Sequence, residues 1–227
     1  MKITLARVAC FGQWIIGKHQ ILRSSTLYNQ QQVRVDLFSD FIEGKVNRAK
    51  AIEITKHFHK DSDRHEIHSQ TEQMPWLNAP NPDYIFLDNF SELTDKRFTH
   101  SSGFDFCGKY GEFEKHIYEE NVNNGTFIDH GLLPTNLIYN EYDRFFTHIK
   151  NKWGNIRIIF INFSTNFEGR QLYKDQGTAI FDAIESLTNK YNIQNLIHPN
   201  PELKPGQDFP YHFSDQNIID MAARIIL

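Results

Sequence analysis

The sequence predicts an α/β protein of three layers, in which a mostly parallel sheet carries helices on both faces. Two short runs are almost entirely apolar, at 82–90 ("PDYIFLDNF") and 155–164 ("NIRIIFINFS"), which is typical of strands buried on both sides. Longer segments with apolar residues at helical spacing lie between the strands. Because strands that alternate with helices pair in parallel through crossover connections, the pattern indicates βαβ units.

The first half of the chain holds three predicted strands. The run "ITLARVA" at 3–9 is mostly apolar and leads through a Cys-Phe-Gly turn into a helix within 12–25. Alternating apolar residues in "QVRVDLF" at 32–38 predict the second strand, and "NRAKAIEITKHFHK" at 47–60 has the composition and spacing of a helix. The run at 82–90 is the third strand, and its carboxyl end is polar.

The second half continues the alternation. A helix is predicted at 137–153, followed by the strand at 155–164 and by a helix at 171–191 that has one apolar face. A short strand at 193–199 precedes the last helix, for which Ser214 is the expected N-cap.

Two segments, 57–81 and 95–135, are less regular and rich in His, Asn, Gly and Ser. We expect a single domain over residues 1–227, in which both segments are insertions that could cover a site. Neither segment is expected to form a separate domain.

Composition argues against several classes of function. The net charge is −4 at pH 7 and no Lys- or Arg-rich block occurs, which disfavours nucleic-acid binding. No apolar run reaches the roughly 18 to 20 residues of a membrane span, and the N-terminus lacks a secretory cleavage pattern, so a cytoplasmic location is expected. The two cysteines, Cys10 and Cys107, are then free thiols. Walker A and Gly-x-Gly-x-x-Gly motifs are absent, which disfavours nucleotide binding and phosphate transfer.

Side chains suited to acyl-transfer chemistry follow the predicted strands. Ligands of open parallel sheets bind beyond the carboxyl ends of the strands. The candidates there are Cys10 and Gly12 after the first strand, Asp88 and Asn89 after the third, Asn162 after the fourth, and His212 in the loop before the last helix. Together they would supply a nucleophile, oxyanion donors and a base.

Cys10 and His212 are the predicted reactive pair. A helix N-terminus or a nearby imidazolium lowers the pKa of a thiol and favours the nucleophilic thiolate. His212 follows Pro210 on a constrained loop, where Asp208 or Asp215 could orient its ring. The alternatives are a Cys10 that is a small buried apolar residue and a His212 that is an ordinary loop histidine.

Asp88, Asn89 and Arg97 are candidates for binding. Asp88 and Asn89 could hold an oxyanion or orient a substrate, and an Asx turn at the strand end is the alternative. Arg97 could bind a carboxylate or phosphate, and a solvated arginine is the alternative that we favour.

The histidine-rich stretch "HFHKDSDRHEIH" at 57–68 raises the question of a metal site. His57 and His59 are two residues apart, so on a helix they would face away from each other. No His-Glu-x-x-His motif and no cysteine pair supports zinc. We therefore expect a solvated insertion and no metal site.

Four blocks of the chain carry a family resemblance. They are "VACFGQW" (8–14), "DYIFLDNFSEL" (83–93), "IRIIFINFSTNFEGR" (156–170) and "DFPYHFSDQNIIDMAARI" (208–225). Their order resembles the SGNH (GDSL-like) hydrolase superfamily, whose sheet is flavodoxin-like, and more narrowly the acetyltransferase-like proteins of bacterial polysaccharide biosynthesis with a cysteine in the first turn. The chain has Ala9 and Cys10 where the superfamily has its Gly-Asp-Ser turn. Asp208 lies four residues before His212, where the superfamily's acid lies three before its histidine.

The resemblance implies an enzyme that transfers or hydrolyses an acyl group, with acetyl expected, on a sugar of a surface polysaccharide. Cys10 would attack the acyl carbonyl, His212 would move protons, and Asp208 would orient His212. Asn89 and backbone N–H groups near Gly12 would hold the oxyanion. A transferase would use acetyl-CoA as its donor, and no other cofactor is implied. The alternative is a non-catalytic glycan-binding or assembly module on the same fold, which the missing serine motivates.

Overall fold

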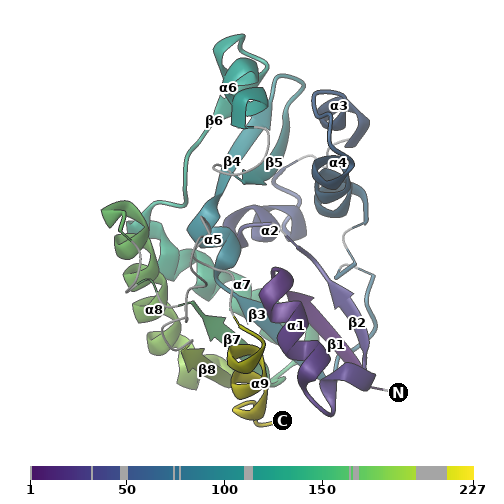
Figure 1. The fold of residues 1–227 in the computed structure, drawn as a ribbon, viewed down its shortest axis with the longest axis vertical. Coiled ribbons are helices and arrows are strands. Elements are labelled where there is room, and N and C mark those ends of the chain that lie inside the picture. Colours follow the sequence, from purple (N-terminus) through teal and green to yellow (C-terminus); the bar gives the residue numbers. More distant parts are fainter. Residues whose placement is uncertain are drawn as a thin grey trace.

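The protein has an α/β fold built on a five-stranded parallel sheet (Figure 1). The computed structural model describes residues 2–31, 33–46, 51–73, 75–76, 78–109, 115–163, 165, 169–197 and 214–227. The strands of the sheet are β1 (Ile3–Arg7), β2 (Thr26–Asn29), β3 (Tyr84–Asp88), β7 (Ile158–Asn162) and β8 (Ile193–Ile197). Their order across the sheet is β2-β1-β3-β7-β8. The second strand, β2, pairs on one side of β1, and β3 and the later strands follow on the other side, so the strand order reverses between β1 and β3.

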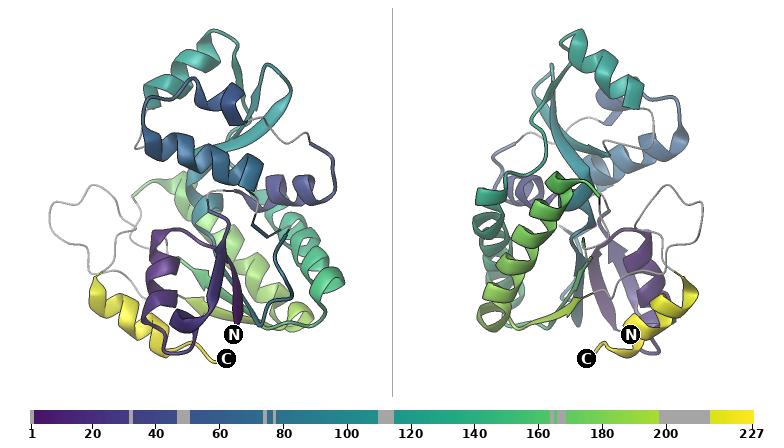
Figure 2. Two further views of the ribbon diagram at one scale, coloured as in Figure 1. Left: turned by 90° about the vertical axis from the view of Figure 1, so that its right-hand side faces the viewer. Right: turned by 60° about the vertical axis from the view of Figure 1, so that its left-hand side comes forward.

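Helices lie against both sides of this sheet. They are α1 (Cys10–Lys18), α2 (Val35–Ile42), α7 (Ile138–Trp153), α8 (Gln171–Tyr191) and α9 (Asp215–Ala223). Figure 2 shows α1 and α9 on one side of the sheet and α7 and α8 on the other. The Ser214 hydroxyl accepts a hydrogen bond from the backbone N–H of Asn217, which confirms Ser214 as the N-cap of α9. The sequence-based prediction of an α/β class is confirmed.

The prediction of a strand at 32–38 is wrong, because this stretch leads into the helix α2. The apolar pattern continues from Val35 to Phe38 and Phe41, which are spaced three residues apart and are all buried. That spacing places the three side chains on one helical face, and it outweighs the short alternation. The actual second strand, β2, has only partly buried or exposed residues, so no apolar pattern in the sequence predicts it.

The two segments predicted as irregular insertions contain regular elements, and these come together with a helix from the stretch 47–60 in what we call the small lobe (Figure 1, upper part). Its elements are α3 (Ala51–Thr55), α4 (Asp61–His68), β4 (Asp95–His100), β5 (Phe104–Lys109), α6 (Lys115–Asn123) and β6 (Phe127–Asp129). The strands form an antiparallel sheet in the order β5-β4-β6. A separate apolar cluster, in which Phe98, Phe106 and Phe127 pack with Tyr118, forms the core of this lobe.

Short helical segments connect these parts. They are η1 (Leu22–Ser24), the π-helical turn η2 (Ser69–Gln73), α5 (Phe90–Thr94) and η3 (Thr135–Leu137). Because α5 directly follows β3 and directly precedes β4, it joins the parallel sheet to the small lobe within a few residues.

Ion pairs tie the small lobe to the helices α2 and α7. On β4, Arg97 Nη1 lies 2.7 Å from Asp40 Oδ2 and 3.4 Å from Asp36 Oδ2, both on α2. The same guanidinium binds Asp105 on β5. Arg144 on α7 reaches the other oxygen of Asp40 at 2.7 Å. Several of these charges are shielded from water, so they fix the lobe's position more firmly than exposed pairs would.

A buried ion pair between Arg7 and Glu92 links the parallel sheet to α5. Arg7 Nη1 lies 2.8 Å from Glu92 Oε1, and the two side chains are 1% and 0% exposed. Glu92 also accepts hydrogen bonds from the Val35 backbone N–H at 2.7 Å and from the Tyr142 hydroxyl at 3.0 Å. Arg7 donates further to the carbonyl of Val33 at 2.9 Å. These contacts join β1, α2, α5 and α7 at one point, and they compensate for the loss of hydration of both charges.

We expect Arg7→Met to lower the free energy of unfolding by about 3–5 kcal/mol, because it leaves the Glu92 carboxylate buried without its cation. Lys190→Met is the matched control. Lys190 Nζ lies 2.6 Å from Asp143 Oδ1, but its side chain is 53% exposed, so its loss should lower the stability far less than the loss of Arg7 does. Chemical denaturation of both variants measures the difference, and equal effects would contradict the structural role of Arg7.

Candidate functional site

Hydrogen bonds from polar side chains cross all five strands at or near the carboxyl edge of the parallel sheet. On β2, Asn29 pairs with both backbone groups of Val8, at 3.1 Å each, just beyond β1. Asp88 at the end of β3 accepts from the backbone N–H of Ala9 at 2.8 Å. The remaining links run from Asn89 through Asn162 on β7 to Asn195 on β8, at 2.8 and 3.4 Å. We call this arrangement the edge row.

Asp88 occupies the central position of the edge row, where the strand order reverses. Its second oxygen accepts the backbone N–H of Phe90 at 3.1 Å, so the carboxyl group holds the chain after β1 and the chain after β3. Burial raises the pKa of Asp88 to about 7, against the opposing effect of these two N–H donors and of Arg7. A carboxyl group with a pKa near neutrality can accept or release a proton at physiological pH. Asp88 is therefore a candidate proton carrier, a role that the sequence did not suggest for it.

Cys10 is the first residue of α1 and is exposed. It directly follows Ala9, whose N–H binds the Asp88 carboxyl, so the thiol-bearing turn is anchored to the centre of the edge row. The alternative prediction, that Cys10 is a small buried apolar residue, is wrong, because its side chain is exposed. The other thiol, Cys107, is buried in the interior, and burial raises its pKa.

Gly12 lies in the first turn of α1 and is buried. A Cβ atom at this position would lie 2.5 Å from the Cβ of Val8, closer than two such atoms can approach. Glycine therefore lets α1 start close against the end of β1, which directs the N-terminal end of the helix toward the edge row.

The amides of Asn89 and Asn162 are engaged with each other and with the backbone. Asn89 donates to Asn162 Oδ1 at 2.8 Å, and Asn89 Oδ1 accepts from the backbone N–H of Phe163 at 3.0 Å. Both side chains are buried. Their observed contacts position the ends of β3 and β7. Asn29 and Asn195, which belong to the same row, were not predicted, because each lies in a strand that also carries another polar residue and so does not stand out in the sequence.

Arg97 lies on β4 in the small lobe and not in the edge row. Its guanidinium is occupied by Asp36, Asp40 and Asp105, so the observed role is to attach the lobe. The remaining predicted residues, His212 and Asp208, lie outside the described residues.

No metal-binding cluster is present in the described part of the chain. Within it, no group of three or more His, Cys, Asp or Glu side chains is arranged to hold an ion. In the histidine-rich stretch, His57 instead faces His100 of β4, with their Nε2 atoms 3.4 Å apart.

Two cavities adjoin α8 near this edge of the sheet. A cavity of about 290 Å³ lies beside Asn162 and is lined by Phe163 and Phe181. A groove of about 570 Å³ opens at the N-terminal part of α8, where Tyr173 and Leu172 face the segment that contains Asn136. The guanidinium of Arg170 stacks on the Tyr173 ring, 3.9 Å from its centroid.

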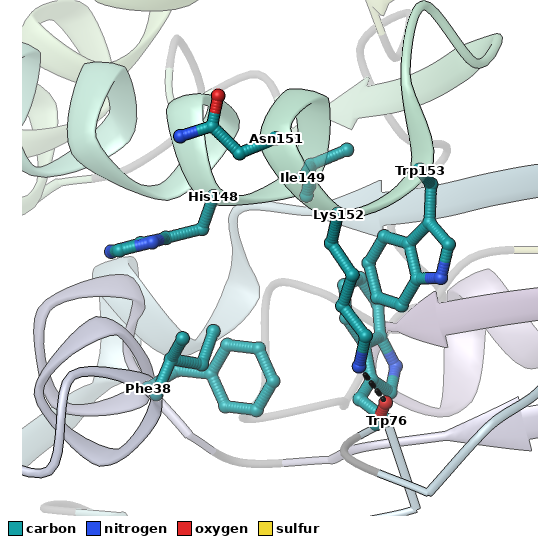
Figure 3. Close-up of a pocket in the computed structure, with 8 residues that line it drawn as sticks. Phe38, Trp76, His148, Ile149, Asn151, Lys152 and Trp153 are labelled. Atoms are coloured by element: carbon teal, nitrogen blue, oxygen red, sulfur yellow. Dashed lines mark hydrogen bonds between the residues drawn. The ribbon is translucent and has the colours of Figure 1, made fainter.

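A more apolar pocket of about 270 Å³ lies between α2 and α7 (Figure 3). Phe38, Trp76 and Trp153 form its aromatic walls, and the rings of Trp76 and Trp153 meet nearly edge to face. Figure 3 shows Lys152 reaching from α7 to the carbonyl of Trp76, a hydrogen bond of 3.4 Å. No predicted site residue lines this pocket, so it is separate from the edge row.

Comparisons with known proteins leave the family open. No protein-family model, no curated protein and no solved structure matches the chain. In the part of the chain that the structure describes, no helix combines the length and apolar character needed to cross a membrane. The class that fold and site define is thus an α/β protein with an exposed thiol at the carboxyl edge of a parallel sheet.

We expect Asp88→Asn to change how stability depends on pH. Because the folded protein raises the pKa of Asp88 to about 7, the folded state keeps a proton that the unfolded chain releases near pH 4. The Asp88 contribution to the free energy of unfolding should therefore fall as the pH rises from about 4 to about 7, by up to about 1.4 kcal/mol per pH unit. The variant should lack this decline. Denaturation series at several pH values measure it, and parallel curves for the two proteins would contradict the raised pKa.

Proposed function

We propose that the protein is an acyltransferase or esterase of the SGNH-like type that acts on a sugar of a surface polysaccharide, with Cys10 as its nucleophile. The observation that carries this proposal is the exposed Cys10 at the N-terminal end of α1, next to the Asp88 carboxyl whose pKa is raised to about 7. An exposed thiol at a helix N-terminus is the setting in which thiolates form most readily.

The strand order supports the SGNH-like part of the proposal. Counted along the chain, the parallel strands have the order 2-1-3-4-5, which is that of flavodoxin-like sheets. In such sheets the ligand binds where the order reverses, and here that point lies between β1 and β3. Cys10 and Asp88 follow these two strands.

The proposed reaction has two steps. The Cys10 thiolate attacks the acyl carbonyl and forms a thioester, and the donor's leaving group departs with a proton. A sugar hydroxyl, or water in an esterase, then attacks the thioester, gives up its proton to a base and releases the thiol. His212, oriented by Asp208, is the proposed base, and Asp88 is a second proton carrier. Backbone N–H groups near Gly12 would bind the oxyanion, and acetyl-CoA is the proposed donor for transfer.

The groove at α8 supports a carbohydrate substrate. Tyr173 and Leu172 give it an apolar wall, while Lys96 and Asn136 add polar groups. Such mixed linings suit a ligand with both C–H faces and hydroxyl groups.

A non-catalytic glycan-binding or assembly module is the second candidate. It is favoured by the engagement of Asn89 and Asn162 in internal hydrogen bonds, which makes these amides structural. In that case the edge row would be a rigid frame, and Cys10 would have no chemical role.

The reactivity of Cys10 distinguishes the two candidates. We expect iodoacetamide at pH 7 to alkylate Cys10 readily, because its side chain is exposed at the first residue of α1. Hydrolysis of p-nitrophenyl acetate should fall at least about 100-fold in Cys10→Ala. Cys107→Ser is the control and should retain the activity, since Cys107 is buried. Near-normal turnover by Cys10→Ala would remove this residue from the mechanism, and an unreactive Cys10 would favour the binding module.

A further inference from the structure

The two histidines His57 and His100 face each other within the small lobe. Their Nε2 atoms are 3.4 Å apart, and both rings pack against Phe127 at centroid distances of 5.3 and 5.8 Å. His57 follows the helix α3, and His100 ends the strand β4. The pair therefore connects the helical part of the lobe to its sheet.

The contacts of His100 determine which nitrogen atoms carry protons. The backbone N–H of Ser102 donates to His100 Nδ1 at 3.1 Å, so this nitrogen is an acceptor. The neutral ring then carries its proton on Nε2 and donates it to Nε2 of His57. His57 must accept at Nε2, so its own proton is on Nδ1.

A proton on His57 Nε2 would face the N–H of His100 and break the contact between the two rings. A proton on His100 Nδ1 would displace the N–H of Ser102, and the Ser102 hydroxyl beside this nitrogen would accept it instead. Burial lowers the pKa of each histidine from its usual value. Lys56 also opposes a positive charge on the pair, and Glu53 favours it more weakly.

We propose that the His57–His100 pair is an acid-sensitive latch that holds α3 onto the antiparallel sheet of the small lobe. The pair is neutral and closed above about pH 6.5, the usual pKa of histidine, and it opens as the pH falls below that value. Because the folded lobe binds fewer protons than the opened lobe, acid lowers the stability of the closed form.

The other end of the helical segment has an anchor that does not titrate. Gln70 in η2 donates to the carbonyl of Cys107 at 2.9 Å and accepts its N–H at 2.8 Å. These amide contacts are independent of pH in this range. Opening therefore begins at α3, while η2 stays attached to β5.

Hydrogen exchange at pH 7.5 and pH 5.5 tests the latch, with protection factors used so that the intrinsic pH dependence of exchange is removed. The protection factors of 51–58 and 95–100 should fall at pH 5.5, by up to about tenfold for each histidine that takes up a proton on opening, since one bound proton changes the closed population by at most tenfold per pH unit. Those of β3 and β7 should stay unchanged. No fall in the lobe, or an equal fall throughout the protein, would overturn the proposal.

Two variants and one control assign the response to the pair. The double variant His57→Phe with His100→Phe should have the same protection at both pH values. His57→Gln, whose amide oxygen can still accept from His100, should show a reduced response and remains informative if the double variant does not fold. His148→Gln is the control, because His148 lies on α7 outside the small lobe, where its Nε2 lies 2.8 Å from Glu43 Oε1, and its loss should leave the lobe's response intact. A full acid response in both pair variants would overturn the proposal.

Discussion

The buried ion pair between Arg7 and Glu92 is the contact on which the rest of the structure depends. Arg7 is the last residue of β1, and Glu92 lies on α5, which connects the parallel sheet to the small lobe. Two charges removed from water are stable only when each finds enough partners, and here the partners are supplied by the chain before α2 and by Tyr142 on α7. The pair therefore requires β1, α2, α5 and α7 to be placed correctly at the same time.

The edge row lies directly beyond this ion pair. Arg7 also donates to the backbone carbonyl of Asp88, at 3.3 Å, so the charge that secures the core also positions the residue at the centre of the row. The row holds its backbone turns with side-chain hydrogen bonds, and it leaves the Cys10 side chain exposed. A rigid frame with one exposed reactive group is what a preorganised site requires.

The sequence predicted the apolar elements well and the polar and edge elements poorly. Strands β1, β3 and β7 are continuous apolar runs, and α7 and α8 have clear helical periodicity, so burial alone identifies them. The edge strand β2 pairs with β1 across α1, and β6 pairs with β4 across β5 and α6, so no local apolar pattern identifies these strands. The sequence also placed Cys10, Asp88 and Asn162 at strand ends, but the raised pKa of Asp88 arises from burial and could only be found in the fold.

The central claim is that Asp88 and Cys10 belong to one site, in which the Asp88 carboxyl titrates near neutrality. Carbon-13 NMR of the Asp88 carboxyl carbon, recorded over a pH series before and after alkylation of Cys10, tests this most directly. We expect a titration midpoint near pH 7 that moves when the thiol is modified, because the backbone N–H that binds the Asp88 carboxyl belongs to Ala9, the residue directly before Cys10. A midpoint near pH 4, or a midpoint that alkylation leaves unchanged, would contradict the account.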